Sequence, residues 1–412
     1  MNRNFLFYCK VVKIMQLISS NKGELPHYMG VPSILILLLQ FLSFFTFFMF
    51  VPTISTHFNQ TVGFSVGFVG LILAIRIISQ QGMMILGGFL ADRIGFKRTA
   101  LSGFIMRGIG FASFGLTTQP MLIIVAAILT GLGGALFSPA LKANLTALTP
   151  RERHKEVFSL MNIVENTGTV LGPLAGLYFN EKSFMILSVL AGVLFVVISI
   201  VVFFLPHTTI PRKSSSWIQE STEIVKNKQF MLLTVSLIPF HFVYQQLYLT
   251  IPIVADKVSG SSGWIFSYVT VIVILFQWPL LLYTKKRRIE YLFTISYFVL
   301  LAMLLPNAIE SQLWTLVLTL TGIAIGAMIF LPVFQSYVAK IAPKESLGAY
   351  FGFSNMAMAL GGSLGNLAGG LLYDFFVETH STDKFWLALS LFILLPIVLL
   401  LKVQSYQPKH GN

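Results

Sequence analysis

Three ionisable side chains lie far inside long apolar stretches of this 412-residue chain. Arg76, Arg107 and Glu165 each stand among runs of Ile, Leu, Val, Phe and Gly. A charge in nonpolar surroundings is costly unless a partner or a function offsets the cost. A buried carboxylic acid that changes its surroundings can bind and release a proton, and a buried guanidinium can hold an anion. These three positions are therefore the first candidates for chemistry.

The composition indicates that the stretches around them face lipid. Hydrophobic residues make up 55% of the chain and charged residues 10%, and the mean hydropathy is +0.80. Soluble domains carry roughly 25% charged residues. Within lipid only helices and closed barrels satisfy the backbone, and continuous apolar runs of about 18 residues or more are typical of helices. The sequence thus predicts an all-α polytopic membrane protein.

We expect twelve transmembrane helices in two pseudo-symmetric six-helix bundles. The predicted spans lie at about 32–55, 64–89, 99–117, 120–141, 156–178, 184–205, 229–254, 262–284, 290–308, 312–337, 346–373 and 385–402. Polar segments divide the chain into a cytoplasmic N-terminal extension, a first bundle, a cytoplasmic linker, a second bundle and a cytoplasmic tail, at 1–31, 32–205, 206–228, 229–402 and 403–412.

The basic residues predict the orientation. Of the 28 Lys and Arg residues, Arg76 and Arg107 lie inside spans, and Lys182, Lys257 and Lys384 lie in odd-numbered loops. The others lie in the terminal segments, in the even-numbered loops or at the neighbouring helix ends. The positive-inside rule then places both termini in the cytoplasm of a multi-pass protein of the cell membrane. The net charge of +13 is accordingly read as a topology signal and a contact with anionic lipids, not as a nucleic-acid site.

The two halves are related by an internal repeat. A shift of 193 residues brings Pro139 onto Pro332 and the segment 150–152 onto 343–345. The same ungapped shift brings Gly168, Gly172 and Gly176 onto Gly361, Gly365 and Gly369. Duplicated halves that move around a central site are typical of secondary transporters.

The loop after the second predicted span carries a cluster of glycines and charges. Gly95 permits a sharp turn there, and Gly88 permits another helix to approach closely. The pattern resembles the G-x-L-a-D-r-x-G-r-k signature of the major facilitator superfamily. In that family the cluster braces one half against the other when the cytoplasmic side is shut, with the acid near a helix N-terminus of the opposite half. The matching residues are Gly88, Asp92, Arg93, Gly95, Lys97 and Arg98.

The fifth predicted span carries small residues at a spacing of four. Gly168, Gly172, Pro173 and Gly176 resemble the G-x-x-x-G-P-x-x-G-G motif of drug–proton antiporters, although Leu177 departs from its last position. Such spacing permits close helix packing, and a proline bends a helix. The resemblance implies export and a pliable helix at the interface between the halves. Over most of its length the chain also resembles multidrug exporters of the MdtH type, for example in Phe47–Pro52, Arg76–Gly82 and Gly131–Phe137.

Several roles remain open for the buried charges. Glu165 is either the protonated group that couples export to the proton gradient, a permanent ion-pair partner of Arg107, or a substrate contact. Arg76 either attracts an anionic substrate or caps carbonyl groups beside Gln80 and Gln81. In this fold the spans 1, 4, 7 and 10 line the cavity. The remaining candidates for substrate contact are therefore polar residues of spans 1 and 7, Gln40, His241, Tyr244, Gln245, Gln246 and Tyr248.

Other chemistries lack a basis in the sequence. No Walker motif, His/Cys cluster or catalytic nucleophile with its base is found, so we expect no enzyme, no metal and no cofactor. The expected protein is a monomeric, proton-coupled antiporter that exports small molecules by alternating access. The resemblance favours lipophilic drugs, while the arginines favour an anionic metabolite such as a carboxylate siderophore. An importer and a non-transporting sensor remain as alternatives.

Overall fold

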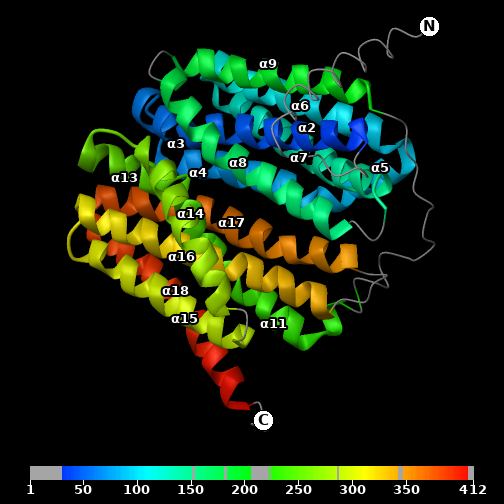
Figure 1. The fold of residues 1–412 in the computed structure, drawn as a ribbon. Coiled ribbons are helices and arrows are strands. Elements are labelled where there is room, and N and C mark those ends of the chain that lie inside the picture. The colour runs from blue at the N-terminus through cyan, green and yellow to red at the C-terminus, as the bar shows by residue number, and fades with distance from the viewer. Residues whose placement is uncertain are drawn as a thin grey trace, which may run out of the picture.

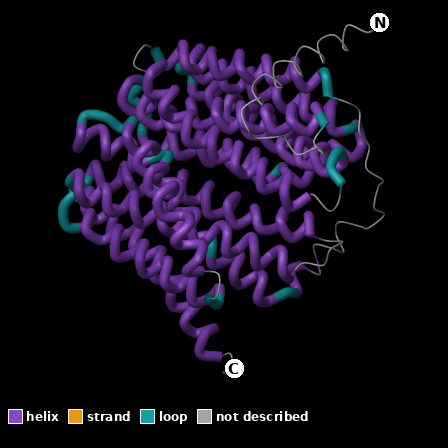
Figure 2. The backbone as a smooth tube through the Cα atoms, viewed as in Figure 1, coloured by secondary structure: helices purple, strands orange, loops and turns teal. Residues whose placement is uncertain are grey.

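Helices account for nearly all of the computed structural model, which describes residues 30–150, 154–180, 183–205, 222, 224–284, 287–341 and 347–406. No strand occurs in these ranges, and short loops join successive helices (Figure 2). In Figure 1 the helices of the first half lie above those of the second half. Residues 1–29 of the predicted extension 1–31, most of the linker and the end of the tail fall outside the described residues.

The first half contains six helical segments in succession. The first two are broken: one is α2, η1, α3 and η2, and the next is α4, η3 and α5. The elements are α2 (Val31–Phe50), η1 (Val51–Thr53), α3 (Ile54–Thr56), η2 (His57–Thr61), α4 (Val66–Ile77), η3 (Ile78–Gly82), α5 (Met84–Ile94), α6 (Phe96–Leu116), α7 (Pro120–Ala147), α8 (His154–Asn180) and α9 (Phe184–Phe203).

The second half repeats this order. Its first segment consists of α11, α12, η5 and α13, and η6 extends its third segment. The elements are α11 (Lys228–Ser236), α12 (Ile238–Tyr244), η5 (Gln245–Leu247), α13 (Thr250–Ser259), α14 (Trp264–Thr284), α15 (Ile289–Leu304), η6 (Leu305–Ala308), α16 (Leu313–Ile341), α17 (Leu347–Glu378) and α18 (Thr382–Tyr406).

This arrangement confirms the predicted fold class. Among the described residues, seven helical stretches are long and apolar enough to cross a membrane on those grounds alone. The broken helix Val66–Gly82 and the stretch Trp264–Gln277 are shorter apolar candidates. We call the side that holds the ends of α3 and α13 the odd-loop face, and the side that holds α5 and α11 the even-loop face; they lie at the left and right of Figure 1.

The seventh span differs from the continuous helix that its apolar pattern predicts. Pro239 follows the end of α11, and Pro252 lies in the first turn of α13. Proline donates no backbone hydrogen bond. The span is therefore divided into α11, α12, η5 and α13 instead of forming one helix. The first span is likewise interrupted at Val51 and Pro52.

Glycines bring equivalent helix pairs into backbone contact in both halves. A Cβ atom on Gly168 would lie 2.8 Å from the carbonyl oxygen of Phe41, and one on Gly172 would lie 2.6 Å from that of Phe45. Helix α8 therefore packs against α2 through its glycine face. The repeated glycines of α17, Gly361 and Gly365, pack in the same way against α12.

The two halves meet most closely where α4 lies along α17. A side chain on Gly70 would overlap the carbonyl group of Asn366, and one on Gly370 would lie 2.5 Å from the carbonyl oxygen of Val66. Ser363 donates a hydrogen bond of 3.4 Å to the carbonyl oxygen of Ala74 in the middle of this contact. The fully buried amide of Asn366 makes no hydrogen bond to any described residue.

We expect Gly172→Leu to prevent α2 and α8 from packing, because its side chain has no space beside Phe45. Overpacking of this kind typically costs about 1–3 kcal/mol. The yield of monodisperse protein and its thermal unfolding temperature should both fall. Gly88→Ala is the matched control, since no atom lies within 4 Å of the added methyl group. Equal stability of the two variants would contradict this packing.

Candidate functional site

Two guanidinium groups share one aromatic ring in the centre of the first half. The Cζ atoms of Arg76 and Arg107 lie 5.1 Å and 4.9 Å from the centre of the Phe47 ring. Arg76 stands in the last turn of α4, Arg107 in the middle of α6, and Phe47 in the last turn of α2. Three different spans thus meet at this point. We call Arg76, Arg107 and Phe47 the arginine cluster.

Aromatic rings surround Arg107 on several sides. Its Cζ lies 5.6 Å from the ring centre of Phe111, 5.1 Å from that of Phe137 and 5.4 Å from that of Phe195. Only 3% of Arg107 is exposed. The electron-rich faces of aromatic rings attract a cation by an amount that grows when water is excluded. These rings hold the guanidinium in place without neutralising its charge.

Arg76 faces the second half of the protein. Its Nη1 donates a hydrogen bond of 3.3 Å to Oε1 of Gln80, one turn further along the chain. Tyr248, at the end of η5, lies close enough to interact electrostatically with Arg76. The ring of Tyr248 also packs against Phe48, with 6.4 Å between ring centres. The arginine cluster therefore borders the interface between the halves.

The glycines of α7 let this cluster form. A Cβ atom on Gly134 would lie 2.6 Å from Nη1 of Arg107 and 2.9 Å from Cδ of Gln80. One on Gly131 would lie 2.5 Å from the carbonyl oxygen of Arg76. The small residues of the fourth span therefore set how closely both arginines approach it.

The ion pair between Glu165 and Arg107 that the sequence left open is not formed in this structure. Instead, Nε2 of Gln40 on α2 donates a hydrogen bond of 2.6 Å to Oε1 of Glu165 on α8. Gln40 is almost fully buried, and its own Oε1 accepts no hydrogen bond from the described residues. Two residues predicted separately, a cavity amide and a buried acid, are thus brought together by the α2–α8 contact.

The candidates of span 7 divide into two groups. Gln246 has a structural role. Its Nε2 donates a hydrogen bond of 2.8 Å to the carbonyl oxygen of Gly365, and its Oε1 accepts one from the hydroxyl group of Thr250. His241 is buried against Gly361 of α17. Tyr244, Gln245 and Tyr248 lie nearer to the first half, since Gln245 and Ile77 both approach Gly362. The second group is the better placed for a ligand between the halves.

The structure describes part of the predicted gate motif. Gly95 has a φ of +91° and joins α5 to α6, as a sharp turn requires. No atom lies within 4 Å of a Cβ placed on Gly88. The ammonium group of Lys97 lies 4.8 Å from the ring centre of Phe203 on α9, in its own half, and Arg98 is exposed. The side chain of Asp92 is outside the described part of the structure.

The glycines of the antiporter-like motif pack within their own half. The backbone of α2 lies so close to Gly168, Gly172 and Gly176 that a side chain would have no room there. These glycines therefore face α2 of their own half. Helix α8 touches the second half elsewhere, along α14. Pro173 is buried within α8 and borders a cavity on the odd-loop face.

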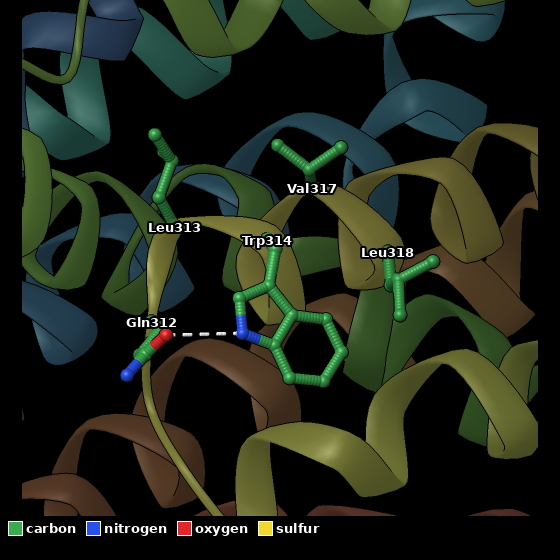
Figure 3. A pocket seen from close by; sticks show the side chains of 5 residues that line it. All are labelled: Gln312, Leu313, Trp314, Val317 and Leu318. Atoms are coloured by element: carbon green, nitrogen blue, oxygen red, sulfur yellow. Dashed lines mark hydrogen bonds between the residues drawn. The ribbon is translucent and has the colours of Figure 1, made fainter.

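That cavity has a volume of about 620 Å³ and is lined by both halves. Phe48, Thr56 and Pro173 contribute from the first half, and Asp256 and Phe266 from the second. A separate hollow lies on the surface at the start of α16. Figure 3 shows the side chains that line it. Among them, Nε1 of Trp314 donates a hydrogen bond of 3.0 Å to Oε1 of Gln312. Its open, apolar lining and its distance from the buried charges make this hollow unsuitable as the substrate site.

One residue that joins the halves was not predicted from the sequence. Near the end of α17, the carboxylate of Asp374 accepts hydrogen bonds from the backbone N–H groups of Val66 (2.9 Å) and Gly67 (2.5 Å). These groups form the first turn of α4, where Ser65 accepts from Phe68. The position of this acid beside the repeated glycines could have marked it as a candidate. Nothing in the sequence identifies its partner Gly67, which lies 307 residues away.

Comparison with known proteins identifies the family to which the chain belongs. The sequence model of the Major Facilitator Superfamily matches residues 36–328 and 261–412. The chain therefore belongs to the major facilitator superfamily and is a multi-pass membrane transporter by family. It is similar to multidrug resistance protein MdtH of Shigella dysenteriae serotype 1 and of Escherichia coli strain K12, with 28% identity over 345 residues in each case. These alignments cover 82% of this chain and 86% of each relative.

Solved structures show the same fold. The nucleoside transporter NupG superposes with a TM-score of 0.73 at 16% identity, covering 92% of this chain and 100% of that one. A bacterial homologue of the human lysosomal transporter Spinster, in an inward-facing and unoccupied conformation, gives 0.76 at 12% identity, with coverages of 94% and 100%.

We expect Gly134→Ala to lower transport without unfolding the protein. The added methyl group would displace the guanidinium of Arg107, the movable end of a long side chain, and not the backbone. Transport should fall by about tenfold, a change of about 1.4 kcal/mol in barrier, while the thermal unfolding temperature stays close to that of the wild type. Gly82→Ala is the control, because its methyl group meets its nearest atom only at 3.9 Å. Unchanged transport by Gly134→Ala would show that the position of Arg107 is unimportant.

Proposed function

We propose that this transporter is a proton-coupled antiporter that exports drug-like small molecules from the cytoplasm. It would act as a monomer in the cell membrane, with both termini in the cytoplasm and the basic loops against anionic lipids. The multidrug resistance names of its relatives support the substrate class. The proton gradient would supply the energy without any cofactor.

The observation that carries this proposal is the pairing of Glu165 with a neutral amide. When Glu165 is ionised, its carboxylate accepts from Nε2 of Gln40. When it is protonated, its hydroxyl group can donate to Oε1 of Gln40, which has no donor among the described residues. An arginine in the same place would hold the acid ionised. Gln40 therefore suits an acid that must exist in both protonation states.

The contacts between the halves support alternating access. At the odd-loop face, Asp374 joins α17 to the start of α4. Further along, Nδ2 of Asn355 lies 3.8 Å from the sulfur of Met84, and beyond it Gly88 is open. Among the described residues, the halves are thus joined more firmly at the odd-loop face than at the even-loop face. In the predicted orientation, this is the state that receives a substrate from the cytoplasm.

We expect Glu165→Gln to abolish accumulation of drug driven by a proton gradient. Everted membrane vesicles with an acidic interior and a panel of labelled lipophilic drugs provide the assay. The neutral side chain cannot exchange a proton, so gradient-driven uptake should fall by about a hundredfold or more, the usual effect of losing a proton-transfer group. Downhill drug exchange should persist, because an amide can still bond to Gln40.

Glu290→Gln is the matched control, since Glu290 is a buried acid of the second half that bonds to Gln229 at 3.0 Å. It should leave the gradient-driven uptake intact. Wild-type uptake by well-folded Glu165→Gln would remove Glu165 from the coupling step. The absence of proton-coupled flux from wild-type protein with every drug would refute the proposed function itself.

A further inference from the structure

The arginine cluster holds two positive charges and no acid. Arg76 is 7% exposed and Arg107 is 3% exposed. Neither forms an ion pair within the part of the chain that the structure describes, and Nε of each lacks a hydrogen-bond partner there. Among the described residues, the two guanidinium groups make one hydrogen bond, that of Arg76 to the neutral Gln80.

Such an arrangement is unfavourable on its own. Burial removes the hydration of each charge. Both guanidinium groups also lie over the same Phe47 ring, so the two like charges are close together and repel each other. Cation–π contacts offset only part of this unfavourable free energy. Glu165, a half-buried acid of the same half, is engaged by Gln40. No acid among the described residues therefore balances the cluster, and a bound anion would supply the missing negative charge.

We propose that the arginine cluster binds the carboxylate of an organic anion with a planar, apolar body. This assignment names the substrate class of the transporter proposed above and rests on that function. A guanidinium donates two parallel hydrogen bonds to a carboxylate, which explains why two arginines and no lysine occupy the cluster. The ring of Phe47 and, from the second half, the ring of Tyr248 provide flat surfaces for the apolar body.

The site would also discriminate by charge. Two fixed cations repel a lipophilic cation, so neutral and anionic compounds should be favoured over cations of similar size. A bound anion that reaches Arg76 while its body contacts Tyr248 would touch both halves. Its binding would then differ between the states in which the halves are close together or apart, as a transported substrate requires.

The test uses purified full-length protein in lipid nanodiscs and two probes that differ in charge, 1-naphthoate and 1-naphthamide. Isothermal titration should show naphthoate binding at least about tenfold more tightly than naphthamide, a difference of about 1.4 kcal/mol. Arg76→Gln and Arg107→Gln should each remove most of this preference. Lys384→Gln, which removes one exposed positive charge far from the cluster, should preserve it.

Equal binding of naphthoate and naphthamide by the wild type would overturn the proposal, and this result does not depend on any variant folding. Wild-type preference in folded Arg76→Gln and Arg107→Gln would overturn it as well. Arg76→Lys tests the fork geometry, since it keeps the charge and should recover only part of the affinity. Proton flux with the drug panel, measured on the same preparation, reports separately on the proposed antiport.

A different observation, the bond of Asp374 to α4, carries a second inference. An ionised carboxylate at a helix N-terminus is stabilised by the free N–H groups and by the helix dipole. Here the carboxylate and the helix belong to opposite halves, so the bond exists only while the odd-loop face is closed. We infer that Asp374 is a latch that favours the state open toward the even-loop face.

The latch can be tested by distance measurement between spin labels at Gln119 and Glu310, which are exposed on the odd-loop face of opposite halves. In a Cys9→Ser background, Asp374→Ala should shift the distance distribution toward longer values. Asp383→Ala, which removes an exposed acid at the start of α18, should leave it unchanged. Identical distributions for Asp374→Ala and the parent would refute the latch.

Discussion

The close contact between α4 and α17 is the constraint on which the rest of the structure depends. Where Gly70 meets Asn366 and Gly370 meets Val66, no side chain separates the two backbones. The contact joins two halves whose helices otherwise pack mostly among themselves, and it brings Tyr248 of the second half close to Arg76 of the first. In lipid, where association gains little from the hydrophobic effect, such small-residue packing is a principal source of affinity between helices.

Much of the fold could be predicted because its determinants are local. Long apolar runs predict the spans, and the shared shift of Gly168 and Gly361 predicts equivalent helix pairs, which the structure forms as α2 with α8 and α12 with α17. The sequence could not show that the glycines of α8 face their own half. A face of small residues predicts close packing but does not identify the helix that packs against it.

The candidate site was predictable in composition but not in pairing. The cost of burial singled out Arg76, Arg107 and Glu165, yet charge alone suggested an ion pair where the structure has an amide and an acid. Gln40 and Glu165 are 125 residues apart, and Asp374 and Gly67 are 307 apart, so only the tertiary arrangement brings them together. In span 7, Gln246 donates to the carbonyl oxygen of Gly365 on α17, 119 residues away, a partner that the sequence does not identify.

The buried amide of Asn366, which has no partner among the described residues, has a consequence for the balance between conformations. A buried polar group without a partner typically costs about 1–3 kcal/mol, and here it lies at the crossing of α4 and α17. Any movement that lets this amide reach a carbonyl group or water would recover that free energy. The crossing point is therefore slightly frustrated in the present arrangement, and this frustration opposes the hold of Asp374 at the odd-loop face. A carrier that must leave each of its states many times needs neither of them to be too stable.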